Sequence, residues 1–129
     1  MSQNKIKWEF VYTTKAPPLA GPLFKTYRAE VPGGWLVKFV YFMGRLNSTH
    51  ALTFMPDPEH IWKTDKDAQW DHIGRLPGVN WNQNTWRYPV HGGWLIADIY
   101  VSTEHFNAAL VFLPGREWEL NSGEEEERQ

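Results

Sequence analysis

A short segment near the middle of the chain carries three side chains that could transfer protons: Asp57, Glu59 and His60. A carboxylate beside an imidazole is a pair that general acid–base catalysis uses, so a small hydrolase is one function to consider. A structural role is favoured, because Asp57 followed by Pro58 is typical of a helix N-cap with proline at the first helical position. Glu59 would then interact favourably with the helix dipole. We therefore predict no catalytic residue in this segment, with the hydrolase as the alternative.

The other side chains with reactive chemistry form no recognisable motif. The chain has no cysteine, and no two of its histidines have the spacing of a metal-binding helix or of a His-x-His pair. There is no Gly-x-Ser-x-Gly motif, and the two Gly-Gly pairs lack the spacing of a phosphate-binding loop. The sequence therefore predicts no metal site and no cofactor, and it favours a protein that is not an enzyme. The five histidines are His50, His60, His72, His91 and His105.

Guanidinium groups and flat rings recur in the chain in a fixed arrangement. Arg28 and Arg87 each follow an aromatic residue, and Trp35 and Trp94 each follow a Gly-Gly pair. Such groups can stack on a nucleobase, hold a phosphate or anchor a protein interface. We predict that these four residues form two related half-sites for a protein partner or a small nucleotide-like ligand. The alternative is that they only pack two halves of the fold together.

This arrangement belongs to an internal repeat. Residues 28–42 align with residues 87–101 at an offset of 59, with seven identities in 15 positions, and both blocks contain the string Gly-Gly-Trp-Leu. After the loss of one residue, residues 51–56 align with residues 109–114. Two matching blocks in the same order indicate a duplication.

Each copy is expected to fold as β-strands. A Gly-Gly pair predicts a turn, because glycine reaches positive φ without a clash, and the β-branched and aromatic run behind it predicts a strand. In the second copy only the strand face that begins at Leu95 is apolar throughout, so this face and its equivalent in the first copy are predicted to form the core. Between the copies, residues 65–73 followed by Gly74 resemble a short helix with a glycine C-cap.

The predicted fold is therefore mostly β. We expect an internally duplicated, pseudo-twofold antiparallel barrel or sandwich of six to seven strands, with at most one or two short helices. A single domain would span residues 1–120, made of two repeats (about 27–62 and 86–118) and a linker at 63–85. Residues 121–129 contain four consecutive Glu and no apolar side chain, which predicts a disordered acidic tail.

Two strings in the first copy are similar to a pattern found in a group of short bacterial and phage-encoded proteins. They are V-P-G-G-W-L-V at residues 31–37 and F-M-P-D-P-E-H-I-W at residues 54–62. The resemblance covers roughly residues 27–62, and the second copy departs from it at His91 and at Gly115-Arg116. It implies a bacterial or phage context and no mechanism.

Composition narrows the function further. The formal net charge of the chain is −2. The acidic tail alone carries −3, so the net charge of the remaining residues is about +1, close to neutral. A neutral body argues against general nucleic-acid binding. No apolar run reaches the length of a membrane span, and no signal peptide is recognisable, so a cytoplasmic protein is expected. Eight Trp residues favour a binding surface. The favoured function is a non-catalytic binding protein of bacterial or phage origin that sequesters or inhibits a partner protein or a small nucleotide-like ligand. A structural, self-assembling protein is a further alternative, and a homo-oligomer would fit either.

Overall fold

The chain folds as eight β-strands, with no helix among the described residues, which are 5–13, 23–43 and 47–115 of a computed structural model. The prediction of a mostly β fold is confirmed, whereas the expected count of six to seven strands is wrong. The first four strands are β1 (Trp8–Thr13), β2 (Leu23–Val31), β3 (Gly34–Met43) and β4 (Asn47–Pro56). The second four are β5 (Asp71–Pro77), β6 (Trp81–Val90), β7 (Gly93–Ser102) and β8 (Phe106–Pro114).

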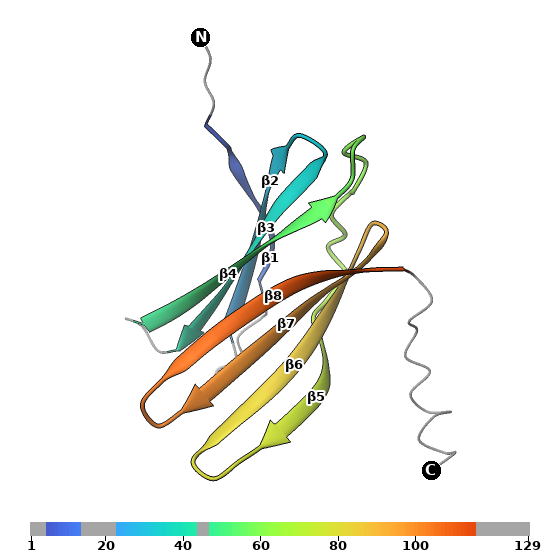
Figure 1. The fold of residues 1–129 in the computed structure, drawn as a ribbon. Coiled ribbons are helices and arrows are strands. Elements are labelled where there is room, and N and C mark those ends of the chain that lie inside the picture. The colour runs from blue at the N-terminus through green and yellow to red at the C-terminus, as the bar shows by residue number, and fades with distance from the viewer. Residues whose placement is uncertain (1–4, 14–22, 44–46, 116–129) are drawn as a thin grey trace, which may run out of the picture.

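The strands form two antiparallel sheets of four, each with its strands in chain order, as Figure 1 shows. The first sheet is β1-β2-β3-β4 and the second is β5-β6-β7-β8. β4 and β8 lie side by side where the two sheets meet, but no hydrogen-bonded ladder joins them. The fold is therefore two packed sheets rather than a closed barrel.

The two duplicated hairpins have the same backbone geometry. Gly33 and Gly92 have φ values of 84° and 83°, a conformation that L side chains rarely adopt. A further hydrogen bond closes each hairpin, from Asp57 N to Gly33 O at 2.9 Å and from Gly115 N to Gly92 O at 2.8 Å. The duplication seen in the sequence thus corresponds to one local structure that occurs twice.

The two copies nevertheless turn opposite faces to the core. In β3 the buried side chains that join the common core are Trp35, Val37 and Phe39, whereas in β7 they are Leu95, Ala97 and Ile99. These sets are out of step by one residue in the repeat alignment, and a shift of one residue along a strand changes the face. The predicted core face is correct for the second copy and wrong for the first.

This difference also corrects the predicted twofold symmetry. A twofold axis that relates the two sheets across a shared core must place equivalent side chains on both inner faces. Trp35 points into the core while its equivalent Trp94 shares the outward face of its sheet with Ile96 and Asp98. The sheets are therefore stacked with unlike faces in contact, so the pseudo-twofold prediction is wrong at the level of the core.

Aromatic rings fill the space between the sheets away from the β4–β8 side. Phe24 of β2 meets Trp86 of β6 with ring centroids 5.1 Å apart, and Tyr12 of β1 meets Tyr88 of β6 at 5.6 Å. On the opposite side, where β4 and β8 approach closely, the inward residues range in size from Ala51 of β4 to Phe112 of β8. The core is thus wide on one side and narrow on the other.

The segment expected to be a helix is instead a turn followed by a strand. Asp65 closes the turn, since its carbonyl accepts a hydrogen bond from Ala68 N at 3.0 Å. Trp70 then enters the core and donates from its indole nitrogen to Thr26 Oγ1 at 3.2 Å, and β5 begins at the next residue. Burying Trp70 between the sheets and pairing β5 with β6 override the local helical preference of this segment. The expected linker therefore contributes a strand of the second sheet.

Gly93 is a sensitive test of this hairpin geometry. A Cβ built there would lie 2.2 Å from the carbonyl oxygen of Leu113, so β7 and β8 would have to separate. We expect Gly93→Ala to destabilise the fold by at least about 2 kcal/mol, a drop in melting temperature of roughly 8 °C. Gly74→Ala is the control, because a Cβ there makes only ordinary contacts with Thr85. Equal melting temperatures for the two variants would contradict the close approach.

Candidate binding sites

Arg28 is enclosed by aromatic rings inside the first repeat. Its guanidinium carbon lies 3.9 Å from the ring centroid of Trp35 and 4.6 Å from that of Trp62. Its Nε donates to Glu9 Oε2 at 2.6 Å, and its terminal nitrogen NH1 donates to the carbonyl oxygen of Trp62, also at 2.6 Å. Arg28 therefore connects β1, β3 and the segment after β4 while its charge remains paired.

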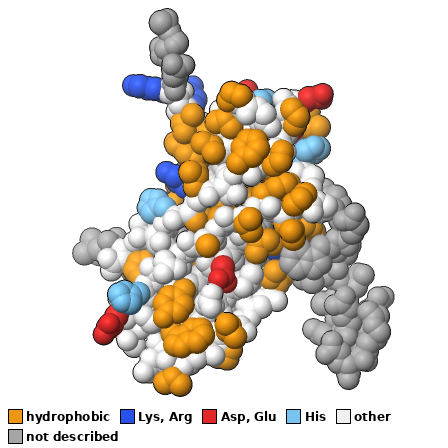
Figure 2. All heavy atoms as spheres, in the orientation of Figure 1, with side chains coloured by type: hydrophobic (Ala, Val, Ile, Leu, Met, Phe, Trp, Pro, Cys, Tyr) orange, Lys and Arg blue, Asp and Glu red, His pale blue; other side chains and the backbone are white. Residues whose placement is uncertain are grey.

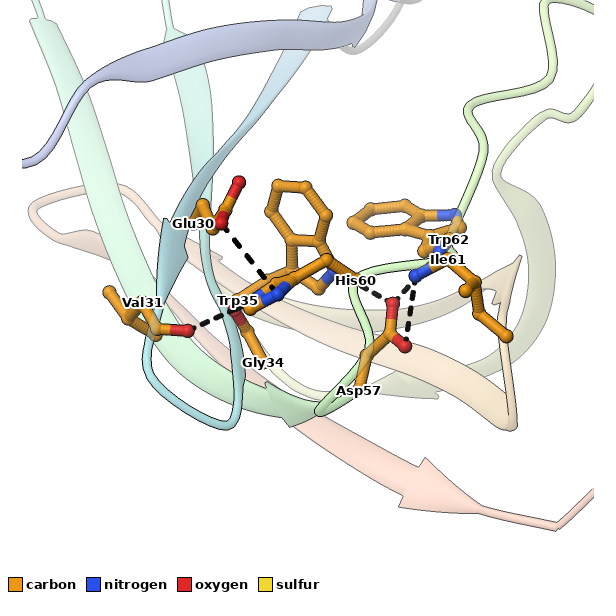
Figure 3. Close-up of polar contacts among 8 residues, drawn as sticks. All are labelled: Glu30, Val31, Gly34, Trp35, Asp57, His60, Ile61 and Trp62. Atoms are coloured by element: carbon orange, nitrogen blue, oxygen red, sulfur yellow. Dashed lines mark hydrogen bonds and ion pairs between the residues drawn. The ribbon is translucent and has the colours of Figure 1, made fainter.

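The Asp57 carboxylate organises the turn that follows β4. It accepts hydrogen bonds from the indole nitrogen of Trp35 at 2.9 Å and from the backbone nitrogens of Ile61 and Trp62 at 3.1 and 2.8 Å (Figure 3). Burial alone would raise the pKa of Asp57, but these hydrogen bonds, with a smaller contribution from His91, hold it below its ordinary value. The predicted capping role is thus found in a turn, and the expected helix after Asp57 is absent.

His60 closes the same turn from the outside. It has a positive φ of 53°, and its Nε2 bonds to the carbonyl oxygens of Val31 and Gly34 at 2.8 and 2.9 Å (Figure 3). These bonds raise the pKa of His60, although burial opposes them, and Glu30, 3.7 Å from Nδ1, adds to the rise. Nε2 donates to both oxygens, so the ring fixes the backbone of the β2–β3 hairpin.

The second repeat keeps the Arg–Trp stack in a different place. The guanidinium carbon of Arg87 lies 3.9 Å from the ring centroid of Trp94, the same distance as in the first copy. Arg87 is opposite Ile96 in the strand register, so this stack belongs to the outward face of the second sheet. Less than a tenth of either side chain is exposed.

The four predicted binding residues therefore do not come together in one site. Arg28 and Trp35 belong to the inner face of the first sheet, whereas Arg87 and Trp94 belong to the outer face of the second. All four are at most 9% exposed, which leaves little of each for a partner to touch. Their contacts within the fold explain why the Arg–Trp spacing is repeated.

The structure instead presents a broad surface that the sequence analysis missed, which we call the basic aromatic face. It is the outward face of the first sheet, and three of its apolar side chains are largely exposed: Phe10 (54%), Leu52 (54%) and Phe54 (45%). Among the described residues, no outward position of β1–β4 is a carboxylate. Alternate side chains of β1 and β4 point to opposite faces of the sheet, so the sequence reveals the exposed face only once the inward face is known. Its residues are Trp8, Phe10, Lys25, Tyr27, Leu36, Lys38, Val40, Phe42, Ser48, His50, Leu52 and Phe54.

Part of the basic aromatic face is hollowed. A depression of about 320 Å³ is lined mainly by rings and by basic or hydroxyl side chains. Two lysines lie against rings of this face: Lys38 Nζ is 4.8 Å from the centroid of Trp8, and Lys25 Nζ is 5.5 Å from that of Phe42. Aromatic edges and cations are thus presented together. The residues of the hollow are Trp8, Tyr27, Lys38, Val40, Phe42, Ser48 and His50. Figure 2 shows hydrophobic side chains at the surface of both sheets on the side of the molecule that it displays.

A second cavity, of about 250 Å³, lies between the segment after β4 and the end of β6. It borders Tyr88, whose hydroxyl is buried and has no hydrogen-bond partner among the described residues. Burial, with smaller effects of Tyr12 and Asp65, raises the pKa of Tyr88 to about 12, so the hydroxyl stays protonated at neutral pH. Charges of both signs, on Lys63 and Asp65, border this cavity, so it has no single preference for a cation or an anion.

Comparisons with family models, with curated proteins and with solved structures found no match to this chain. Within the described ranges, no cluster of three or more His, Asp or Glu side chains is arranged to hold a metal ion. No helix in the same ranges is long and apolar enough to cross a membrane. The predicted acidic tail lies outside the described residues and stays a prediction.

The Asp57 contacts predict a specific pH dependence of stability. Because the folded-state pKa of Asp57 is below its unfolded value of about 3.9, its contribution is complete above that value and is lost as the pH falls through the folded-state pKa. We expect Asp57→Asn to lower stability at pH 7 by roughly 1–2 kcal/mol and to flatten the loss of stability below about pH 4. Thermal melts from pH 2.5 to 7 would test this. A parallel downward shift of the whole curve would contradict the role of the charge.

Proposed function

We propose that this chain is a cytoplasmic, non-catalytic binding protein of bacterial or phage origin that sequesters or inhibits a partner protein through its basic aromatic face. The observation that carries the proposal is this face itself, which combines exposed apolar side chains with lysines and no carboxylate. Interface cores are enriched in aromatic residues, and exposed apolar patches mark interaction sites. The matching partner would present apolar side chains beside carboxylates.

Asp57 and His60, which were considered for catalysis, have a structural role in this proposal. Both carboxylate oxygens of Asp57 accept hydrogen bonds from groups of the fold, and His60 Nε2 is bonded to two backbone carbonyls. A general base needs an atom that can reach a substrate proton. These contacts leave Asp57 and His60 as supports of the hairpin, so we assign them no catalytic role.

Of the predicted Arg and Trp residues, Arg28 enters the proposal as a positioning residue. Arg28 holds Glu9 of β1, and the neighbours of Glu9 in that edge strand are Trp8 and Phe10, two rings of the basic aromatic face. An edge strand has a ladder on one side only, so such a tether limits its motion. Arg28 thereby fixes two contact residues on the opposite side of the sheet.

A small nucleotide-like ligand is a second candidate, because the hollow has the groups that it would need. Tyr27 and Phe42 supply rings for a base, and Lys38 supplies a cation for a phosphate. Isothermal titration of the protein with nucleoside monophosphates would test this candidate. Binding that Lys38→Met weakens about tenfold or more would support it, and no heat of binding at millimolar ligand would contradict it.

The proposal of a partner protein is tested by disrupting the exposed apolar part of the basic aromatic face. We expect the chain purified from its natural host to carry a partner that is visible by native mass spectrometry, and Leu52→Glu to lose it. Disrupting an interface contact of this kind commonly costs at least about 2 kcal/mol of binding free energy, roughly 30-fold in affinity. The cause is the burial of an unpaired charge in the interface.

The matched control is Val79→Glu, which places the same charge on an 82% exposed side chain in the turn between β5 and β6 of the other sheet. It should retain the partner, and both variants should melt within a few degrees of the natural protein. Retention of the partner by folded Leu52→Glu at natural affinity would overturn the assignment of this face.

A further inference from the structure

The two repeats pack against each other through different faces of the same duplicated unit. The first repeat contributes the face that begins at Trp35, and the second contributes the face that begins at Leu95. In the repeat alignment, Trp35 corresponds to Trp94 and Leu36 to Leu95, so the contact joins two different faces of one duplicated unit. An interface between unlike faces does not close on itself, because each repeat keeps one unused face and the two unused faces are of different kinds.

The two unused faces are the outer faces of the molecule. The basic aromatic face, with Leu36 and Phe54, is the first repeat's equivalent of the inner face of the second sheet, with Leu95 and Phe112. The other unused face, called the second outer face here, is the equivalent of the inner face of the first sheet. Its open part combines apolar and polar side chains: Leu76, Trp81, Gln83, Thr85, Ile96, Asp98, Tyr100, Asn107, Ala109, Val111 and Leu113.

The charges on these two faces are complementary. At the middle of β7, Asp98 is the equivalent, in the repeat alignment, of Phe39, which is buried in the core. At the middle of β3, Lys38 is the equivalent of Ala97, which is also buried in the core. Two apolar core positions are thus replaced by one acid and one base on the outer faces. Lys38 lies among rings and aliphatic side chains, whereas Asp98 lies beside Gln83 and Thr85.

We propose that the basic aromatic face of one chain packs against the second outer face of the next copy, so that copies stack head to tail. The new contact repeats the face pairing of the core, with Lys38 of one copy opposite Asp98 of the other. This inference goes beyond the proposed function: it uses the same face, but the occupant is a second copy of the chain. Because the contact joins unlike faces, the assembly grows into a chain of copies or closes as a ring.

The open part of the second outer face determines where the contact forms. Arg87 and Trp94 are almost completely buried, so these two side chains offer little to a partner. Val111 and Leu113 of β8 are 53% and 41% exposed, and Asp98 is half-buried beside them in the sheet. The carboxylate of Asp98 accepts hydrogen bonds from Gln83 Nε2 at 2.7 Å and Thr85 Oγ1 at 2.9 Å, which fix its position in the face.

A charge exchange tests the stacking in the full chain. Sedimentation velocity over a concentration series should show oligomers of the natural protein that grow with concentration. Lys38→Glu and Asp98→Lys should each raise the dissociation constant at least about tenfold, because each variant opposes two like charges in every contact. An equimolar mixture of the two variants should associate again, since each contact in an alternating stack pairs opposite charges. The double variant with both changes should also associate.

Several outcomes would overturn the stacking. A natural protein that stays monomeric up to millimolar concentration would do so, as would single variants that associate as well as the natural protein. Stronger association of Lys38→Ala than of the natural protein would also do so, because the charges would then prevent stacking. If Asp98→Lys fails to fold, Asp98→Asn keeps the hydrogen-bonded shape and should still weaken association about fivefold or more. If the chain is monomeric while Leu52→Glu still loses a different bound protein, the stacking fails and the proposed function stands.

Discussion

This structure depends more on which alternate side chains of each strand face the core than on any single contact. A strand between a core and solvent can give only alternate side chains to the core, so each hairpin must commit one of its two faces. Here two copies of one hairpin share one core, and they commit opposite faces. The copy with Trp35, Val37 and Phe39 inward supplies large rings, and the copy with Leu95 and Ala97 inward supplies smaller side chains. The inward residues of β7 are thus smaller than those of β3, and Trp86 and Tyr88 of β6 supply the rings of the second sheet.

The Arg–Trp stack shows how one local structure serves in two environments. Its geometry depends on contacts within the hairpin, so the same separation of 3.9 Å occurs in both copies although one stack faces the core and the other faces outward. In the first copy, Asp57, His60 and Trp62 complete the enclosure. The second copy has Gly115 at the position of Asp57, and its backbone nitrogen still closes the hairpin to Gly92. The backbone bond is thus conserved between the copies, while the carboxylate is specific to the first.

The same constraint links the core to the proposed surfaces. Once unlike faces are paired inside, the faces left outside cannot be equivalent, and one of them becomes the basic aromatic face. An exposed face of this kind has Leu52 and Phe54 in water, which favours its burial against another protein. The opposite charges of Lys38 and Asp98 then select among possible partners, because a misplaced like charge in an apolar contact is costly.

The sequence by itself determined the local structure. The alternation of apolar and polar residues predicted strands, the Gly-Gly pairs predicted the turns, and the repeat of Gly-Gly-Trp-Leu predicted that the two hairpins are alike. The recurring Arg and Trp residues predicted two half-sites for a ligand or partner, and their stacking on each other was not predicted. The strand β5 was missed, because its short run from Asp71 shows no clear alternation and is held in place by pairing with β6.

Only the tertiary structure decided which faces are buried. Both faces of β3 carry apolar side chains, with Val37 and Phe39 on one and Leu36 and Val40 on the other, so local patterning does not choose between them. The choice depends on Trp70 and on the second sheet, which are distant in sequence and contribute their contacts only after the chain has folded. The same choice determined that the Arg–Trp pairs are enclosed and that the first sheet presents its rings and lysines to solvent.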